Sequence, residues 1–351
     1  MKCAVTLNTI ETRVRALRQL LCLSNSDRTA FFDSYTAFET ANAVCSRSDF
    51  RNGVALRPLL TEGDERIVAY YKVLNLICAL GCVEKMYIPP VIDETLTLQE
   101  NQCLFEALMA NDIKANKMQD RESRVLELGC GRGRIAENMS RNFGPRTTVV
   151  GMNIDASQLE EANAWAAKQE RTACLEFLEA DFNKEWAFPD ESFAGIYAVQ
   201  PLTYAVSLEQ VFREAYRVLE AGGRICILDA VLLDKFDSSN KEHMDMISPV
   251  RQLLGMGGAW HHSYWSSALE AAGFHVEFND DVSLNKTQAP LIRSAESDYK
   301  NISKLVGLAS CVGAPHLPAM MDRFARHTEA FVEMDSQRLI TTSWYICAIK
   351  G

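Results

Sequence analysis

The stretch that decides the fold is residues 124–133, which read Arg-Val-Leu-Glu-Leu-Gly-Cys-Gly-Arg-Gly. Its first half is a short apolar run, typical of a buried strand. Its second half carries three glycines, which allow a tight turn and let a ligand approach the backbone. The turn opens a helix, so it also places backbone N–H groups beside such a ligand. We therefore predict a ligand-binding loop here, with a tight turn that binds no ligand as the alternative.

The glycine spacing does not fit a dinucleotide. The dinucleotide fingerprint needs a glycine three residues after its second glycine, and Arg134 occupies that place, while the third glycine is Gly133. An acid just before the loop, Glu127, suits a cationic or amino-bearing ligand better than a pyrophosphate. We therefore expect that NAD does not bind.

Strand and helix patterns alternate after the loop. Short apolar runs at 147–152, 175–178, 194–199 and 224–228 predict strands, and helical patterns separate them, as at 157–168 and 208–219. Such alternation predicts a parallel sheet with helices on both faces. Two later runs, 274–278 and 343–349, predict two more strands. The helical residues between them suggest a lid over the carboxyl edge of the sheet, and helices at about 9–23, at 64–82 and from Thr97 precede the core.

Composition narrows the class of protein. The 351 residues are 48% apolar and 23% charged, which are globular values. Lys and Arg total 36 against 46 Asp and Glu, so the net charge is −10 and a nucleic-acid partner is not expected. The 11 scattered cysteines suggest reduced thiols in a cytosolic protein. No apolar run is long enough to span a membrane, and the first residues do not read as a secretory signal.

Several segments together resemble the motifs of class I S-adenosylmethionine (AdoMet)-dependent methyltransferases. Glu127-Leu128-Gly129-Cys130-Gly131-Arg132-Gly133 resembles motif I of that family. The segments that resemble its later motifs are Gly151-Met152-Asn153-Ile154-Asp155, Ala180-Asp181-Phe182, Phe188-Pro189-Asp190-Glu191-Ser192-Phe193 and Arg217-Val218-Leu219-Glu220-Ala221-Gly222-Gly223. The resemblance implies an AdoMet-binding enzyme with a Rossmann-like α/β fold and a seven-stranded, mostly parallel sheet whose last two strands form an antiparallel pair.

A narrower resemblance is to sterol 24-C-methyltransferases. It rests on Asn153, on residues 228–237 after the fifth strand, and on the C-terminal stretches 330–333 and 340–345. Residues 96–102 are also similar to cyclopropane fatty-acid synthases. The chain departs from the sterol enzymes in residues 80–90, which replace an aromatic, glycine-rich segment. It departs again at Gln200 and Tyr204, which stand where those enzymes carry a glutamate and a histidine.

The resemblance implies a set of cofactor-binding residues. Glu127 can accept hydrogen bonds from a ligand ammonium through the loop, Asn153 can bind ribose hydroxyls, and Asp181 can accept from the adenine amino group with Phe182 against the ring. The full expected set is Glu127, Gly129, Cys130, Gly131, Asn153, Ile154, Gln158, Asp181, Phe182 and Gln200.

On the acceptor side, Asp229 ends the fifth strand, at the edge where open α/β sheets bind ligands. The densest aromatic and polar cluster is Trp260-His261-His262-Ser263-Tyr264-Trp265. Its aromatic rings could stabilise the carbocation that forms when an olefin is methylated; alternatively, the cluster is the start of a helix with two tryptophans in the core. Asp229, Tyr204 and His261 are the expected catalytic residues, any of which could remove a proton after methylation of an olefin. No metal is expected, because adjacent histidines in a helix point apart.

The sequence thus predicts three parts: an N-terminal helical segment at 1–95, an AdoMet-binding core at 96–283, and a lid with the last strand at 284–351. The predicted activity is AdoMet-dependent C-methylation of an apolar, isoprenoid or sterol-like acceptor, with S-adenosylhomocysteine as product. Methylation of oxygen or nitrogen on a specialised metabolite, a rearrangement without methyl transfer, and a non-enzymatic binding subunit are the alternatives. The expected location is the cytoplasm; association with endomembranes, peripheral membrane contact and a homodimer are left open.

Overall fold

The computed structural model describes residues 9–40, 65–81, 83–114, 121–294, 316–325 and 327–351. One seven-stranded sheet lies at its centre, with the strand order β3-β2-β1-β4-β5-β7-β6. The strands are β1 (Ser123–Leu128), β2 (Thr147–Asn153), β3 (Leu175–Glu179), β4 (Phe193–Val199), β5 (Leu219–Leu232), β6 (Phe274–Asp281) and β7 (Ile340–Lys350). Only β7 runs against its neighbours, β5 and β6, so the predicted mostly parallel sheet is confirmed.

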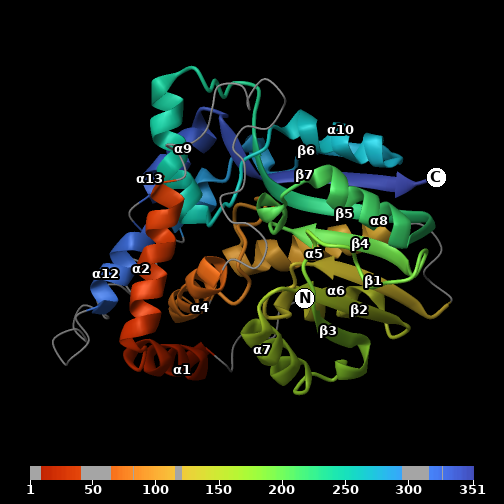
Figure 1. The fold of residues 1–351 in the computed structure, drawn as a ribbon, viewed down its shortest axis with the longest axis horizontal. Coiled ribbons are helices and arrows are strands. Elements are labelled where there is room, and N and C mark those ends of the chain that lie inside the picture. The colour runs from red at the N-terminus through yellow and green to blue at the C-terminus, as the bar shows by residue number, and fades with distance from the viewer. Residues whose placement is uncertain (1–8, 41–64, 82, 115–120, 295–315, 326) are drawn as a thin grey trace.

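Helices precede, separate and follow the strands. They are α1 (Thr9–Leu21), α2 (Asn25–Thr40), α4 (Glu65–Leu80), α5 (Leu98–Lys114), α6 (Arg134–Phe143), α7 (Ala156–Ala166), α8 (Leu208–Val218), α9 (Lys241–Leu254), α10 (His262–Ala272), α12 (His316–Ala325) and α13 (Thr328–Ser336). Figure 1 shows α1, α2 and α12 gathered beside α4 at one end of the molecule, with the sheet at the other. None of the helices within the described ranges is long and apolar enough to cross a membrane.

Two apolar clusters cover the two faces of the sheet. Helices α5 and α6 pack on one face through residues such as Phe105 and Met139. Helices α8 and α10 belong to the other cluster through residues such as Phe212 and Trp265. The same cluster takes in Tyr70 of α4, so the N-terminal helices share one core with the sheet rather than forming a separate unit.

The strand order places a ligand crevice in a defined position. Strands β2 and β3 lie to one side of β1, and β4 and β5 lie to the other, so the connections leave the sheet in opposite directions at β1 and β4. Open parallel sheets bind ligands at such a switch point, outside the carboxyl ends of the strands. The loops that follow β1 and β4 flank this point.

Candidate functional site

The glycine loop after β1 is the first wall of the site. Gly129, Gly131 and Gly133 all have positive φ values, of 67°, 52° and 71°, which residues other than glycine rarely adopt. A Cβ on Gly129 would lie 2.5 Å from Pro201 in the loop after β4, and one on Gly133 would lie 2.5 Å from Phe177. A Cβ on Gly131 would meet only the Oε1 atom of Gln158, at 3.2 Å. The outer glycines therefore serve packing, whereas Gly131 keeps the space in front of the loop open.

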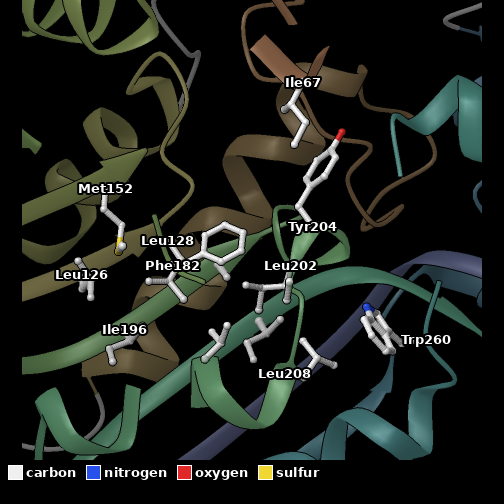
Figure 2. Packing of buried hydrophobic residues seen from close by; sticks show 14 of the residues in the cluster. Ile67, Leu126, Leu128, Met152, Phe182, Ile196, Leu202, Tyr204, Leu208 and Trp260 are labelled. Carbon is white, nitrogen blue, oxygen red and sulfur yellow. The ribbon is translucent and has the colours of Figure 1, made fainter. Parts of the chain in front are cut away.

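A first cavity lies in front of this loop, at the carboxyl edge of β1, β2 and β4, with a volume of about 130 Å³. It is lined by nine of the ten residues predicted to bind the cofactor: Gly129, Cys130, Gly131, Asn153, Ile154, Gln158, Asp181, Phe182 and Gln200. Figure 2 shows the Phe182 ring among the buried residues at this edge, and Tyr204 pointing toward Ile67 of α4. The loop motifs and a helix from the N-terminal segment thus enclose one space.

The end of β2 supplies a polar side of the cavity. Asn153 donates from Nδ2 to Oε1 of Gln158 over 3.3 Å. Asp155 caps α7 because its Oδ1 atom accepts from the backbone N–H groups of Ser157 and Gln158. Its buried Oδ2 atom has no hydrogen-bond partner within the described residues. Asp155 itself lines the cavity, so a ligand bound there could supply the missing donor; no role had been predicted for this side chain.

Glu127, near the end of β1, is 1% exposed and does not line the cavity. Its Oε2 atom accepts a 2.9 Å hydrogen bond from the Tyr197 hydroxyl. Burial raises the pKa of this carboxyl from 4.5 to about 8, against the hydrogen bond from Tyr197, which lowers it. A cation above the loop would favour the ionised form, so Glu127 can act on a ligand as a charge rather than as a direct contact.

Two buried arginines form a further wall that sequence reasoning had not identified as functional. Arg134 begins α6, donates to Oε2 of Glu84 over 3.2 Å and stacks on the Trp165 ring at 3.9 Å. Burial lowers the pKa of its guanidinium to about 10. Arg132 donates to the backbone oxygen of Glu84 over 3.1 Å. These contacts fix the segment before α5 against the glycine loop.

A second, larger cavity of about 270 Å³ adjoins the first. Its lining is largely apolar. It comes from α4, from residues 81–99 between α4 and the start of α5, from the end of α9 and from residues 291–294, and it includes Leu74, Ile77, Leu253, Leu254, Leu291 and Ile292. Four residues line both cavities: Tyr71, Lys85, Met86 and Gln200. The two spaces therefore meet at one shared wall.

Gln200 fixes this shared wall. It follows β4 with a φ of 58°, and its Nε2 atom donates to the backbone oxygens of Ile88 and Thr342, each over 2.9 Å. Its Oε1 atom accepts from the backbone N–H of Ile88 over 3.3 Å. The amide therefore ties the segment before α5 to β7. Its side-chain role is structural, although the residue borders the cavity as predicted.

The three predicted catalytic residues do not converge. Tyr204 lines the first cavity, and its hydroxyl bonds to the backbone oxygen of Gly255 and lies 3.4 Å from the Tyr71 hydroxyl. Asp229 lines neither cavity. Its two carboxylate oxygens accept from the N–H groups of Leu202 and Ala230, at 2.9 and 2.7 Å. Burial raises the pKa of Asp229 to about 7. Its role here is to hold the loop after β4.

His261 also lines neither of these two cavities, and its catalytic role stays a prediction. It is the N-cap of α10, with Nδ1 accepting from the N–H of Ser263. Because this N-cap has extended backbone (φ −71°, ψ 141°), the imidazoles of His261 and His262 do not point apart as two helical residues would. Both contact the exposed carboxylate of Asp234, at 3.3 and 2.8 Å.

Trp260 and Trp265 are buried core residues, 2% and 0% exposed, which agrees with the core alternative for this aromatic cluster.

The described part of the segment predicted to close over the cofactor borders the second cavity instead, and residues 295–315 of that segment lie outside the described ranges. The described residues that cover the first cavity opposite the glycine loop come from α4, including Ile67, Val68, Tyr71 and Asn75. Of the described residues in 284–340, Leu291, Ile292, Ser294 and Thr328 line the second cavity and none lines the first. The helical pattern was predicted correctly, but a pattern of apolar positions does not say which cavity a helix covers.

Comparison with known proteins finds a methyltransferase domain and distant relatives. Residues 125–223 match a family model described as a methyltransferase domain. Sterol 24-C-methyltransferase from Debaryomyces hansenii is 31% identical over 192 residues, which cover 54% of this chain and 50% of that protein. The chain thus spans about half the length of the curated relatives it matches.

Two solved structures share the fold at low identity. One is the [4+2]-cyclase SpnF, with a TM-score of 0.63, 17% identity, and coverage of 82% of this chain and 96% of that one. The other is the mycolic acid cyclopropane synthase CmaA1 complexed with S-adenosylhomocysteine and CTAB, with a TM-score of 0.61, 15% identity, and coverage of 76% and 90%.

Proposed function

We propose that the chain is an AdoMet-dependent methyltransferase that methylates an apolar acceptor, because residues 125–223 match a methyltransferase domain and the chain is similar to sterol 24-C-methyltransferases. The observation that carries the proposal is the pair of adjoining cavities with a shared wall. A methyl donor in the first cavity and an apolar molecule in the second would meet at Tyr71, Met86 and Gln200. Methyl transfer depends chiefly on such alignment of donor and acceptor.

The residues of the first cavity fit AdoMet. When bound, AdoMet supplies a methyl group on a positively charged sulfur. Gly131 leaves room for its amino-acid part, and Asn153 and Asp155 can bind the ribose hydroxyls. Asp181 and Phe182 can hold the adenine, one by a hydrogen bond to its amino group and the other against its ring. The unpartnered Oδ2 atom of Asp155 supports this assignment, since a buried acceptor of this kind calls for a donor.

The residues of the second cavity favour an apolar acceptor, and we propose an isoprenoid or sterol-like molecule that is methylated on carbon. Leucines and isoleucines from three parts of the chain line it. Lys85, whose Nζ atom is paired with Glu106, is the only charged side chain among its described lining residues, so the cavity offers mainly apolar contact. Sterol 24-C-methyltransferases among the relatives support the same acceptor class.

Two measurements test the proposed function. Titration calorimetry should show that the purified chain binds AdoMet and S-adenosylhomocysteine but not NAD. Incubation with methyl-labelled AdoMet and a neutral-lipid extract should then transfer label into an organic-soluble product and release S-adenosylhomocysteine. A chain that binds neither compound refutes the donor assignment. Label found only in water-soluble products refutes the apolar acceptor and favours a polar specialised metabolite.

A further inference from the structure

Two histidines and an aspartate meet outside both cavities, where β5 ends and α10 begins. They are Asp234, in the loop after β5, and the adjacent residues His261 and His262. One ring nitrogen from each histidine and one carboxylate oxygen all lie within 4.8 Å of one another, and no other group of three such side chains is this compact among the residues that the structure describes. None of the three lines either cavity, so an inference about them does not rest on methyl transfer.

The backbone brings these three side chains together. Leu232, the last residue of β5, forms a parallel bridge with His261, and its N–H donates to the backbone oxygen of Trp260 over 2.8 Å. This pairing places Asp234, two residues beyond the strand, beside the start of α10. Because His261 is the extended N-cap and His262 the first helical residue, their rings lie side by side, with centroids 4.3 Å apart.

The distances between the polar atoms fit the ligands of one small ion. The Nε2 atoms of His261 and His262 lie 3.3 and 2.8 Å from Oδ1 of Asp234. Zinc bonds of about 2.0–2.2 Å at angles of about 90–110° hold neighbouring ligand atoms about 2.9–3.4 Å apart. An ion would take the place of the ring protons between these atoms with little movement. The Asp234 side chain is 82% exposed, so water can reach a fourth position on the ion.

Contacts behind the two rings orient them toward the carboxylate. Nδ1 of His261 accepts from the N–H of Ser263 over 3.3 Å in one tautomer; in the other it donates to the hydroxyl oxygen of Ser263, 2.7 Å away, which leaves Nε2 for an ion. The His262 ring packs against Trp344 of β7, with centroids 4.5 Å apart. The positive end of the α10 dipole opposes a cation here, and the negative charge of Asp234 offsets it.

From this geometry we propose that Asp234, His261 and His262 bind one divalent transition-metal ion of the Zn²⁺ class, which links the end of β5 to the start of α10. Imidazole ligands favour such an ion over Mg²⁺ and Ca²⁺, which prefer oxygen ligands. Three protein ligands leave a fourth tetrahedral position for water. The ligands come from segments 28 residues apart that meet in the folded chain, so the ion stabilises the fold.

Titration of the metal-free protein with Zn²⁺, against a competing chromophoric chelator, measures the affinity. We expect one Zn²⁺ ion per chain and Mg²⁺ binding at least about 100-fold weaker. His262→Ala and Asp234→Asn should each weaken Zn²⁺ binding at least about tenfold. His261 stays unchanged, because its removal also takes away the α10 cap. His243→Ala is the matched control: His243 accepts from the N–H of Asp237 over 3.0 Å, lies outside the cluster, and its loss should leave the affinity unchanged.

The type of ligand needs its own measurement, because the chain also has 11 cysteines and thiolates bind Zn²⁺. Co²⁺ in place of Zn²⁺ gives visible d–d bands with nitrogen, oxygen or sulfur ligands, but a near-ultraviolet charge-transfer band with thiolates alone. We expect d–d bands without that charge-transfer band. The bands should weaken in His262→Ala and Asp234→Asn and stay in His243→Ala.

The outcomes separate this site from the alternatives. One-to-one binding that weakens in both ligand variants, with a Zn²⁺-dependent rise in thermal stability that the control keeps and the ligand variants lose, supports it. Absence of one-to-one binding, an affinity unchanged in the ligand variants, or binding that brings the thiolate band overturns it. Circular dichroism of the metal-free variants checks that they fold, and if one does not, the other decides. S-adenosylhomocysteine binding is measured separately, so failure of the metal site leaves the proposed function untouched.

Discussion

Replacement of Glu127 by glutamine tests the electrostatics beneath the glycine loop. The folded chain holds the Glu127 proton more tightly than the unfolded chain, because burial raises the pKa of this carboxyl from 4.5 to about 8. A raised pKa of this kind adds stability in full below about pH 4.5, and the added stability is lost as the pH rises to about 8. Glutamine has the same shape, keeps an oxygen for the Tyr197 hydroxyl and does not titrate.

The size of this effect follows from the two pKa values. With 4.5 for the unfolded chain and about 8 for the folded one, the Glu127 contribution falls from about 4 kcal/mol at pH 5 to below about 1 kcal/mol at pH 8. Asp229, whose pKa is also raised, contributes in the same direction in both proteins. The free energy of unfolding should therefore drop about 3 kcal/mol more in the wild type than in Glu127→Gln between these pH values. Urea titrations at both pH values measure this difference.

Cofactor binding supplies a second, independent measurement. At pH 7 a carboxyl with a pKa of about 8 is about 90% protonated. A cationic ligand above the loop would lower that pKa by about 1–3 units, so binding should release about 0.4 to 0.9 proton. Calorimetry in buffers with different ionisation enthalpies reports the released proton, and Glu127→Gln should release close to none. Parallel pH profiles of stability, or equal proton release in both proteins, would refute this account of Glu127.

Three other substitutions test the remaining assignments. Gly131→Val should weaken AdoMet binding at least about 100-fold by filling the cavity. Gly222→Val is the control, because Gly222 has a similar φ of 78° and a Cβ there would meet no atom within 4 Å; it should share the backbone strain and leave binding unchanged. Equal loss of affinity in both variants would refute the assignment of the glycine loop to AdoMet binding. Asp229→Asn should lower the free energy of unfolding by about 1–3 kcal/mol, because an amide N–H group replaces one oxygen that faces a backbone donor; unchanged urea stability would contradict this. His261→Ala should cost about 1 kcal/mol of stability through loss of the α10 cap and leave AdoMet affinity within about threefold; a larger loss of affinity in calorimetry would restore a role for His261 at the site.

The donor side of the site could be predicted from its resemblance to methyltransferase motifs, most of which lie at or just after the ends of strands. Glycines after one apolar run, an asparagine after the next and an acid after the third all reach the same edge of a parallel sheet. The period of two residues along each strand and the turn residues after it set these positions locally. The structure accordingly places Gly131, Asn153 and Asp181 around one cavity.

The catalytic residues could not be predicted in the same way. Asp229 also lies near the carboxyl end of its strand, but the register between β5 and β7 shifts just after it, between Asp229 and Val231. Its carboxylate accepts from the N–H groups of Leu202 and Ala230 instead of lining a cavity. His261 was placed by a helical pattern, yet it is the extended residue before α10. In both cases a local backbone detail, rather than the residue type, decides where the side chain points.

The second cavity, the proposed acceptor site, lies almost wholly outside the part of the chain that matches the methyltransferase domain. The match to the methyltransferase domain covers residues 125–223, and of the residues lining the second cavity only Gln200 falls within it. The rest come from residues 71–99 and from residues 253–294 and 328, where helices that cover the sheet can change without disturbing the strands or the glycine loop. Methyl-donor binding can therefore be inferred from the relatives, whereas the acceptor must be inferred from the residues that line this cavity. A variant that exchanged residues 80–90 for those of a sterol 24-C-methyltransferase should keep AdoMet affinity in calorimetry but change which isoprenoid binds; retention of the original preference would place selectivity elsewhere in the cavity.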